Sequence, residues 1–214
     1  MKRNTLHDPI ATLALFLMVS VSFVSQAQAD LYRVVENHIT VDTSPEIAWT
    51  VVADFAGVSD FHALFDESNL LKGEEGMLQI GSERESHIPD GINNVILKER
   101  ITDMQEGSFY SYTVYEWENI QLEGMQVTYG VGVNELGQTE IYNRTVFRLK
   151  SGMITGLMRS KFDRGSKDSL ISYKYFIETG QEEKDLKKLR KWFKKRQKDP
   201  AEVDFLVSND RINR

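Results

Sequence analysis

The stretch VDTSPEIAWTVVADFAGVSDFH, residues 41–62, decides the fold because it marks where a strand ends and helices begin. The hydroxyl of Ser44 can cap a helix, the next residue is a proline tolerated in a first helical turn, and an acid follows near the positive helix end. The pattern predicts a helix over residues 45–54 and, after a glycine, a second short helix over residues 59–65.

The segments on either side of this stretch are predicted to be strands. Residues 35–42 alternate apolar and polar side chains, as a half-buried strand does. Turn signals such as Pro-Asp-Gly and Glu-Gly separate six further candidates. These cover residues 69–72, 81–88, 95–103, 108–117, 126–134 and 139–149. Consecutive hairpins imply antiparallel pairing, so the sequence predicts one large curved sheet of about seven strands.

A long helix is predicted after the last strand, over residues 155–179, with Gly180 as its C-cap. Small residues in its middle let this helix approach a surface closely or leave space beneath it. They are Gly165, Ser166, Ser169 and Ser172. An antiparallel sheet with its helices gathered on one side is an α+β architecture. A curved sheet wrapped round a long helix is the helix-grip fold, which often encloses a cavity between sheet and helix.

One carboxylate, Glu99, lies on the otherwise apolar face of the strand predicted over residues 95–103. If Ile88 pairs with Val95 across the preceding hairpin, Arg84 lies directly opposite Glu99 on the same face. Opposed side chains have Cβ atoms about 4.5–5.5 Å apart, which suits an ion pair. Three roles stay open: an internal pair that fixes the register, the polar end of a ligand cavity, or a catalytic acid or base at Glu99. The arginine opposes the raised pKa that acid catalysis would need.

Tyrosines and one asparagine complete the candidate site. Tyr110 and Tyr112 share a strand face, and Tyr129 shares another with three valines; such rings suit a cavity wall but are also ordinary sheet residues. Asn143 is a lone polar residue on an apolar face, where it either bonds the backbone or contacts a ligand. The predicted ligand-binding residues are Arg84, Glu99, Tyr110, Tyr112, Tyr129 and Asn143.

Several kinds of chemistry are not supported by the sequence. The chain has no cysteine, which excludes disulfides and thiolate chemistry. The histidines lack metal-ligand spacing, and His62 is expected at the surface. Neither a nucleophile elbow nor a phosphate-binding glycine loop is present, so no cofactor or metal is expected. Residues 30–180 carry 13 basic and 24 acidic side chains, which argues against a nucleic-acid partner.

Residues 1–29 are predicted to be a signal peptide. They combine a basic start, an uncharged apolar run over residues 10–24, and an Ala-x-Ala pattern before the expected cleavage after Ala29. The run is shorter than the roughly 20 residues that span a bilayer. We therefore expect a bacterial protein that is exported, either to the periplasm or out of the cell.

Residues 181–214 form a separate basic element. Within them, residues 182–198 predict a helix with Leu186, Leu189 and Phe193 on one face and many lysines elsewhere. Such a helix either docks by its apolar stripe onto the acidic body or contacts an anionic membrane or a protein partner.

Taken together, these residues resemble the SRPBCC superfamily, which includes START lipid-binding domains and the polyketide cyclase/dehydrase group. Members typically show an Ala/Ser-Pro-Glu-x-x-Trp helix start followed by Asp-Phe, as residues 41–62 do. Further matches are Gly81-x-x-Arg84, Glu99, Tyr112-x-Val114 and Phe147. The resemblance is greatest to periplasmic, signal-bearing members, and it implies a START-like ligand-binding domain over residues 30–180.

Three functions follow as expectations. The first is an exported, non-catalytic protein that binds an apolar small molecule or lipid between the sheet and the long helix, with Arg84 and Glu99 as the polar anchor. The second, implied by the resemblance, is a polyketide cyclase or dehydratase that uses Glu99 and a tyrosine as proton handlers. The third is an envelope accessory protein whose basic C-terminal segment meets a partner.

Overall fold

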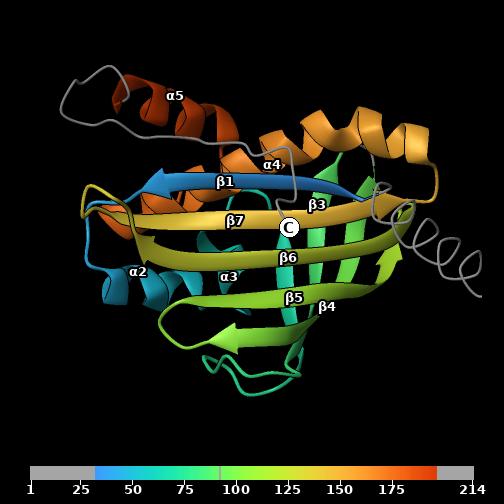
Figure 1. Cartoon of the computed structure of the whole chain (residues 1–214), viewed down its shortest axis with the longest axis horizontal. Coiled ribbons are helices and arrows are strands. Elements are labelled where there is room, and N and C mark those ends of the chain that lie inside the picture. Colours follow the sequence, from blue (N-terminus) through green and yellow to red (C-terminus); the bar gives the residue numbers. More distant parts are fainter. Residues whose placement is uncertain (1–31, 92, 197–214) are drawn as a thin grey trace, which may run out of the picture. The chain divides into compact units, whose positions relative to one another are not determined.

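The computed structural model describes residues 32–91 and 93–196, and in this part of the chain seven strands and four helices occur (Figure 1). The strands are β1 (Arg33–Thr40), β2 (Glu67–Lys72), β3 (Glu83–Asp90), β4 (Asn93–Gln105), β5 (Phe109–Glu118), β6 (Leu122–Val133) and β7 (Thr139–Leu149). The helices are α2 (Pro45–Val52), α3 (Val58–Phe61), α4 (Gly152–Thr179) and α5 (Leu186–Arg196). The predicted signal peptide and the last residues of the predicted basic segment lie outside the described residues.

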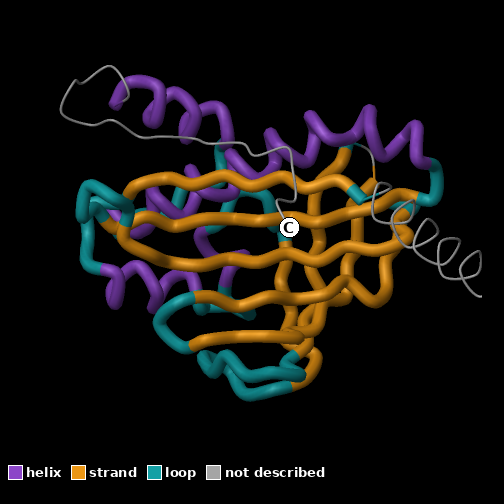
Figure 2. The backbone as a smooth tube through the Cα atoms, viewed as in Figure 1, coloured by secondary structure: helices purple, strands orange, loops and turns teal. Residues whose placement is uncertain are grey.

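All seven strands belong to one antiparallel sheet with the order β1-β7-β6-β5-β4-β3-β2. Strands β2 to β7 pair as consecutive hairpin neighbours, and β1 joins the free edge of β7. Figure 2 shows the sheet bending, so that strands near its β2 edge run across the direction of β1, β7 and β6. The predicted α+β helix-grip fold, with two short helices after the first strand, is confirmed.

The helix ends follow the predicted capping residues. The Ser44 hydroxyl accepts a hydrogen bond from the Ile47 N–H at 3.4 Å, and Gly180 ends α4 in the left-handed conformation with φ of 64°. The second helix is a single turn that ends at Phe61, shorter than predicted. The backbone of His62 is extended there, which turns its side chain inward.

Helix α4 packs on the sheet through residues spaced three or four apart, so they share one helix face. This inward face comprises Thr155, Met158, Phe162, Ser166, Ser169 and Tyr173. The ring of Phe162 stacks on that of Phe147 in β7 with centroids 3.8 Å apart, which fixes the direction of the face. The two halves of α4 differ strongly in burial. No residue of 166–178 is exposed, whereas eight residues of 152–165 are.

Helix α5 contributes to this difference because it covers the C-terminal half of α4, on which Phe61 of α3 also packs. Its Leu189 and Phe193 are buried, Trp192 makes an edge contact with Tyr175 of α4, and Arg190 Nε donates to Asp168 Oδ1 at 2.7 Å. Of the two fates predicted for its apolar stripe, docking is therefore the one observed. None of the helices within residues 32–91 and 93–196 is both long enough and apolar enough to cross a membrane.

Candidate functional site

The hairpin register places Arg84 directly opposite Glu99, as predicted from the pairing of Ile88 with Val95. Both side chains are 1% exposed. Arg84 Nε donates to Glu99 Oε2, and the Ser86 hydroxyl donates to the same oxygen at 3.0 Å. Arg84 Nη1 donates to a backbone carbonyl in the segment after α2, that of Phe55. The pair thus ties β3, β4 and this segment together.

Aromatic rings surround the guanidinium group of Arg84. Its central carbon lies 4.2 Å from the centroid of the Phe55 ring and 5.3 Å from those of Phe65 and Tyr112. Burial alone would lower the pKa of Arg84, but the charge of Glu99, its hydrogen bond to Arg84 and the nearby tyrosines Tyr112 and Tyr110 together outweigh this effect and raise it. The arginine therefore stays charged, and the structure shows the pair as an internal, hydrogen-bonded ion pair.

The three predicted tyrosines form a buried stack beside this pair. Ring centroids lie 6.3 Å apart between Tyr110 and Tyr112 and 6.0 Å apart between Tyr110 and Tyr129, and Tyr173 of α4 is 5.4 Å from Tyr129. Burial raises the pKa of Tyr129 to about 12 and that of Tyr112 well above its ordinary value. These phenols stay protonated at neutral pH, so they can donate hydrogen bonds but cannot act as bases.

His62 is fully buried, so its predicted surface position is wrong. Its Nδ1 accepts from the backbone N–H of Leu64 at 3.2 Å, so the ring proton lies on Nε2, which donates to Ser169 Oγ at 2.8 Å. Burial, aided by the charges of Arg84 and Lys184, lowers the pKa of His62 to about 3. A neutral ring with this tautomer cannot take a proton from Ser169, so the contact is no nucleophile–base pair.

Ser169 also contacts the hydroxyl of Tyr129, at 2.7 Å between the oxygens. This hydroxyl on α4 therefore links the histidine after α3 with a tyrosine of β6. The sequence carried one signal for this link, the small residues in the middle of the long helix. Their size was predicted to allow close approach to a surface, but their partners could not be identified.

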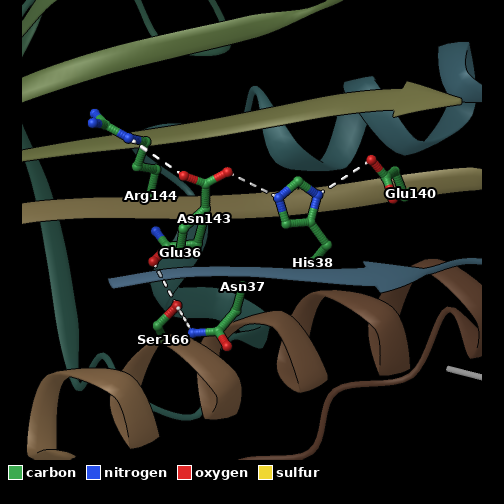
Figure 3. A network of polar contacts seen from close by, with 7 residues as sticks. All are labelled: Glu36, Asn37, His38, Glu140, Asn143, Arg144 and Ser166. Atoms are coloured by element: carbon green, nitrogen blue, oxygen red, sulfur yellow. Dashed lines mark hydrogen bonds and ion pairs between the residues drawn. The ribbon is translucent and has the colours of Figure 1, made fainter. Parts of the chain in front are cut away.

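Asn143 lies opposite Tyr129 in the register of β6 and β7, and it also belongs to the polar network of Figure 3. It pairs with Asn37 across β7 and β1, and its Oδ1 accepts from the Ser166 hydroxyl at 2.7 Å. Asn37 Nδ2 donates to the same hydroxyl at 3.0 Å. Neither of the two predicted alternatives describes this contact, because the partner of Asn143 is a side chain of α4.

The opposite face of β1 and β7 carries a charged group, which Figure 3 also shows. The two ring nitrogens of His38 contact carboxylate oxygens of Glu36 and Glu140, at 3.1 and 3.2 Å. Arg144 Nε lies 3.4 Å from Glu36. Among the described residues, no group of three or more His, Asp or Glu side chains has an arrangement that could hold a metal ion.

Five of the six predicted site residues therefore meet in one closed cluster, and Asn143 lies at its side, opposite Tyr129. None of the six is more than 6% exposed, so no predicted residue lines an open site. Their ligand-binding role stays a prediction.

A groove of about 1090 Å³ opens elsewhere, between the α2–α3 segment and the loop that follows β2. Its charged lining residues are all acidic: Asp54, Asp60, Glu75 and Glu106. Glu106 accepts a hydrogen bond from Trp49 Nε1 at 2.8 Å. None of the predicted ligand-binding residues lines this groove. This groove could not be predicted from the sequence, because its walls come from segments that are distant along the chain.

On the inner face of the sheet and on α4, some apolar side chains are only partly covered. Trp117, Met125 and Met158 are partly buried, and Met125 pairs across β6 and β7 with the buried Phe147, whose ring stacks on Phe162 of α4. A bulge in β5 brings Trp117 to this face. Because Glu99 pairs with Val114 and Lys98 with Glu116, Tyr115 is an extra residue, and the inward alternation resumes at Trp117.

Comparison with known proteins agrees with this architecture. A family model described as polyketide cyclase / dehydrase and lipid transport matches residues 32–171, which confirms the predicted SRPBCC superfamily. Among curated proteins, no relative matches the sequence.

Several solved structures are similar. Ara h 8.0201 is 12% identical, with a TM-score of 0.56 over 68% of this chain and 97% of that one. Ginseng major latex-like protein 151 from Panax ginseng is 14% identical, with a TM-score of 0.55 over 70% and 97%. XoxI from Bacillus cereus is 17% identical, with a TM-score of 0.51 over 68% and 94%. At these identities the likeness shows the fold.

Proposed function

Because the chain belongs to the polyketide cyclase/dehydrase and lipid transport family, we propose that it binds an apolar small molecule or lipid without transforming it. One observation carries the proposal. The inward-facing Met158 in the N-terminal half of α4 and the inward-facing Trp117 and Met125 of the sheet remain partly exposed, whereas the side chains facing the other half of α4 are closed. An apolar ligand entering here would cover surface that the fold leaves in contact with water.

The side chains at this position suit a ligand that is recognised by shape and apolarity. Met125 and Met158 come from the sheet and from α4, so they face the space from two sides. Methionine is unbranched and polarizable, and it repacks around different shapes at small cost. The indole of Trp117 adds a large flat surface. The proposal is therefore for a hydrocarbon-rich ligand.

In this proposal the cluster of Arg84, Glu99 and the tyrosines forms the closed inner end of the site. The hydrogen bonds of the ion pair are internal to the protein, which supports a structural role for it. A buried ion pair contributes little net stability but specifies which groups pair. The pair would hold the sheet in register while the ligand is held by apolar contacts beyond it.

The alternative of a cyclase or dehydratase has weaker support. A base at Glu99 would have to reach a substrate, yet this carboxylate already accepts from Arg84 and Ser86 and is 1% exposed. The neighbouring tyrosines have raised pKa values, so a tyrosinate base is disfavoured at neutral pH.

Two further parts of the proposal rest on the ends of the chain. The signal-peptide pattern of residues 1–29 supports export, so the ligand would be met in the periplasm or outside the cell. The basic segment 182–198 would contact an anionic membrane or protein partner. Since the apolar stripe of α5 is docked on α4, its exposed lysines are the groups available for that contact.

Native mass spectrometry of protein purified without delipidation tests the binding proposal. We expect an additional mass that organic extraction removes. Met158→Trp, which puts a larger ring on the inward face of α4 at the proposed site, should lose this mass. Met153→Trp on the opposite face of the same helix is the matched control and should keep it. A chain that carries no extra mass and takes up no added fatty acid would contradict the proposal.

A further inference from the structure

The first turns of α4 carry apolar side chains on the face that points away from the sheet. Met153 is 76% exposed, Leu157 is 72% exposed and Ile154 is 44% exposed. Met153 and Leu157 lie four residues apart and share a helix face, opposite the inward-facing Thr155 and Met158. Met153 and Leu157 take no part in packing the helix on the sheet, and the less exposed Ile154 lies at the side of the helix, one turn before Met158. Single exposed apolar residues are ordinary, but three within five positions of one helix form a patch.

The same outward face is covered farther along the helix. Around Asp168 and Tyr175 it is packed against α5 through Arg190 and Trp192, and this cover ends before the first turns of α4. Figure 1 shows α5 and the N-terminal half of α4 along the same side of the sheet, at the top of the view. Helix α5 and the apolar patch therefore belong to one side of the molecule.

The charge on this side is opposite to that of the body. Residues 150–167 carry five basic side chains and one acidic side chain, although residues 30–180 as a whole are strongly acidic. Around α5, five lysines are exposed while its apolar stripe is docked. They are Lys187, Lys188, Lys191, Lys194 and Lys195. Apolar side chains flanked by lysines are the pattern of helices that lie on anionic membranes.

We propose that the patch of Met153, Ile154 and Leu157 inserts into an anionic lipid surface while the exposed lysines of α5 contact its headgroups. This inference relies on the proposed function only for its purpose, since docking would bring the ligand site under α4 close to a source of apolar molecules. In a two-fold dimer that pairs this face with itself the basic charges would repel one another, so they favour an anionic lipid surface over a second copy of the chain. The chain's own residues 197–214 are the other occupant that the test separates.

Sedimentation with vesicles tests the proposal. The protein is recovered from the periplasm of an expression host in the processed form that the host yields, and all variants are prepared alike. We expect binding to vesicles of phosphatidylcholine with phosphatidylglycerol, and at least tenfold weaker binding to phosphatidylcholine alone. The double variant Met153→Ser, Leu157→Ser should bind the anionic vesicles about tenfold more weakly or worse, because the inserted apolar surface is lost. Leu136→Ser, at a side chain 74% exposed in the β6–β7 turn, is the matched control and should bind normally.

The electrostatic part has its own variant. Replacing Lys187, Lys191 and Lys194 with Gln should weaken binding more than tenfold, since each basic residue near such a surface contributes roughly fivefold. Lys72→Gln, on β2, should have no effect. Raising the salt concentration should weaken binding of the wild type more than binding of the lysine variant.

Three outcomes would overturn the proposal. The first is normal vesicle binding by the Met153→Ser, Leu157→Ser variant. The second is a wild type that binds vesicles only after residues 197–214 are removed, which would make this segment the occupant of the patch. The third is a dimer that the double variant dissociates, which would make a second copy the occupant. Ligand retention is measured separately by native mass spectrometry, so loss of vesicle binding with retained ligand would leave the proposed ligand binding intact.

Discussion

The two halves of α4 lie on the same sheet but carry different surroundings. The C-terminal half is enclosed by the tyrosine stack, the hydroxyl contacts of Ser166 and Ser169, and the cover of α5. The N-terminal half has half-buried methionines beneath it and an uncovered apolar face above it. The side chains of the C-terminal half all pack within the fold. The N-terminal half retains apolar surface that stays exposed to water. We therefore place the proposed ligand site and the proposed lipid-inserting patch at the N-terminal half of α4.

The largest effect is expected in the closed half, from Glu99→Gln. The substitution leaves Arg84 buried without a counter-charge, so the free energy of unfolding should fall by about 3–5 kcal/mol. Chemical denaturation measures this change. Glu116→Gln breaks the exposed pair with Lys98 and should cost less than about 1 kcal/mol. Equal losses of unfolding free energy in Glu99→Gln and Glu116→Gln would contradict the view that the cluster around Arg84 is closed to water.

The next largest effect is expected from weakening the docking of α5, which covers only the C-terminal half of α4. Leu189→Ala removes a buried contact of α5 with the body, and docking of α5 should weaken by about 2–4 kcal/mol. Hydrogen exchange reports this as faster exchange in residues 166–178. Residues 152–165, which α5 does not cover, should be unaffected. Equally faster hydrogen exchange along the whole of α4 would show that the two halves of the helix do not open independently.

Acid should destabilise the closed half through His62. Its pKa is lowered to about 3 in the folded protein, so the unfolded chain takes up a proton first as the pH falls below about 6.5. The stability that the neutral ring confers is complete above this pH and is lost progressively towards pH 3. Between pH 6 and 4.5 the loss should be about 2 kcal/mol.

His62→Gln provides the control, because a glutamine cannot be protonated in this range. The difference in unfolding free energy between wild type and variant should narrow as the pH falls, while contributions from carboxylates cancel. A difference that stays constant from pH 7 to 4.5 would refute the assignment of a buried neutral histidine.

The smallest effect is expected in the open half. Replacing Met153 and Leu157 with Ser removes only exposed side chains, so stability should change by less than about 0.5 kcal/mol. Thermal unfolding at low salt measures it. A loss above about 2 kcal/mol would mean that these residues pack against the folded chain.

Local and hairpin-scale features of the fold could be predicted from sequence. The pairing of Arg84 with Glu99 followed from the inward alternation of two neighbouring strands and one hairpin, and it is observed. Strand β6 begins four residues earlier than predicted, at Leu122. Glu123-Gly124 indicated a turn, but the structure accommodates it as a register shift opposite β7. A glycine signal marks either a turn or a bulge, and only the partner strand decides between them.

The state of the site could not be predicted in the same way. Whether the cluster around Arg84 is open or filled depends on Phe55, Phe65 and Tyr173, which arrive from segments far apart in the chain. The burial of His62 depends on how early α3 ends. Such contacts are long-range and leave no periodic pattern in the sequence, so the predicted residues were brought together but not in an open cavity.

The methionine methyl groups allow the most direct test of the central claim, that an apolar ligand binds under the N-terminal half of α4. Met125 and Met158 line the proposed site, Met153 lies on the opposite face of the helix, and Met77 lines the acidic groove. In a methyl NMR titration with a medium-chain fatty acid below its micelle concentration, the signals of Met125 and Met158 should shift and saturate at one equivalent. Shifts confined to Met77 or Met153, with Met125 and Met158 unchanged, would contradict the claim.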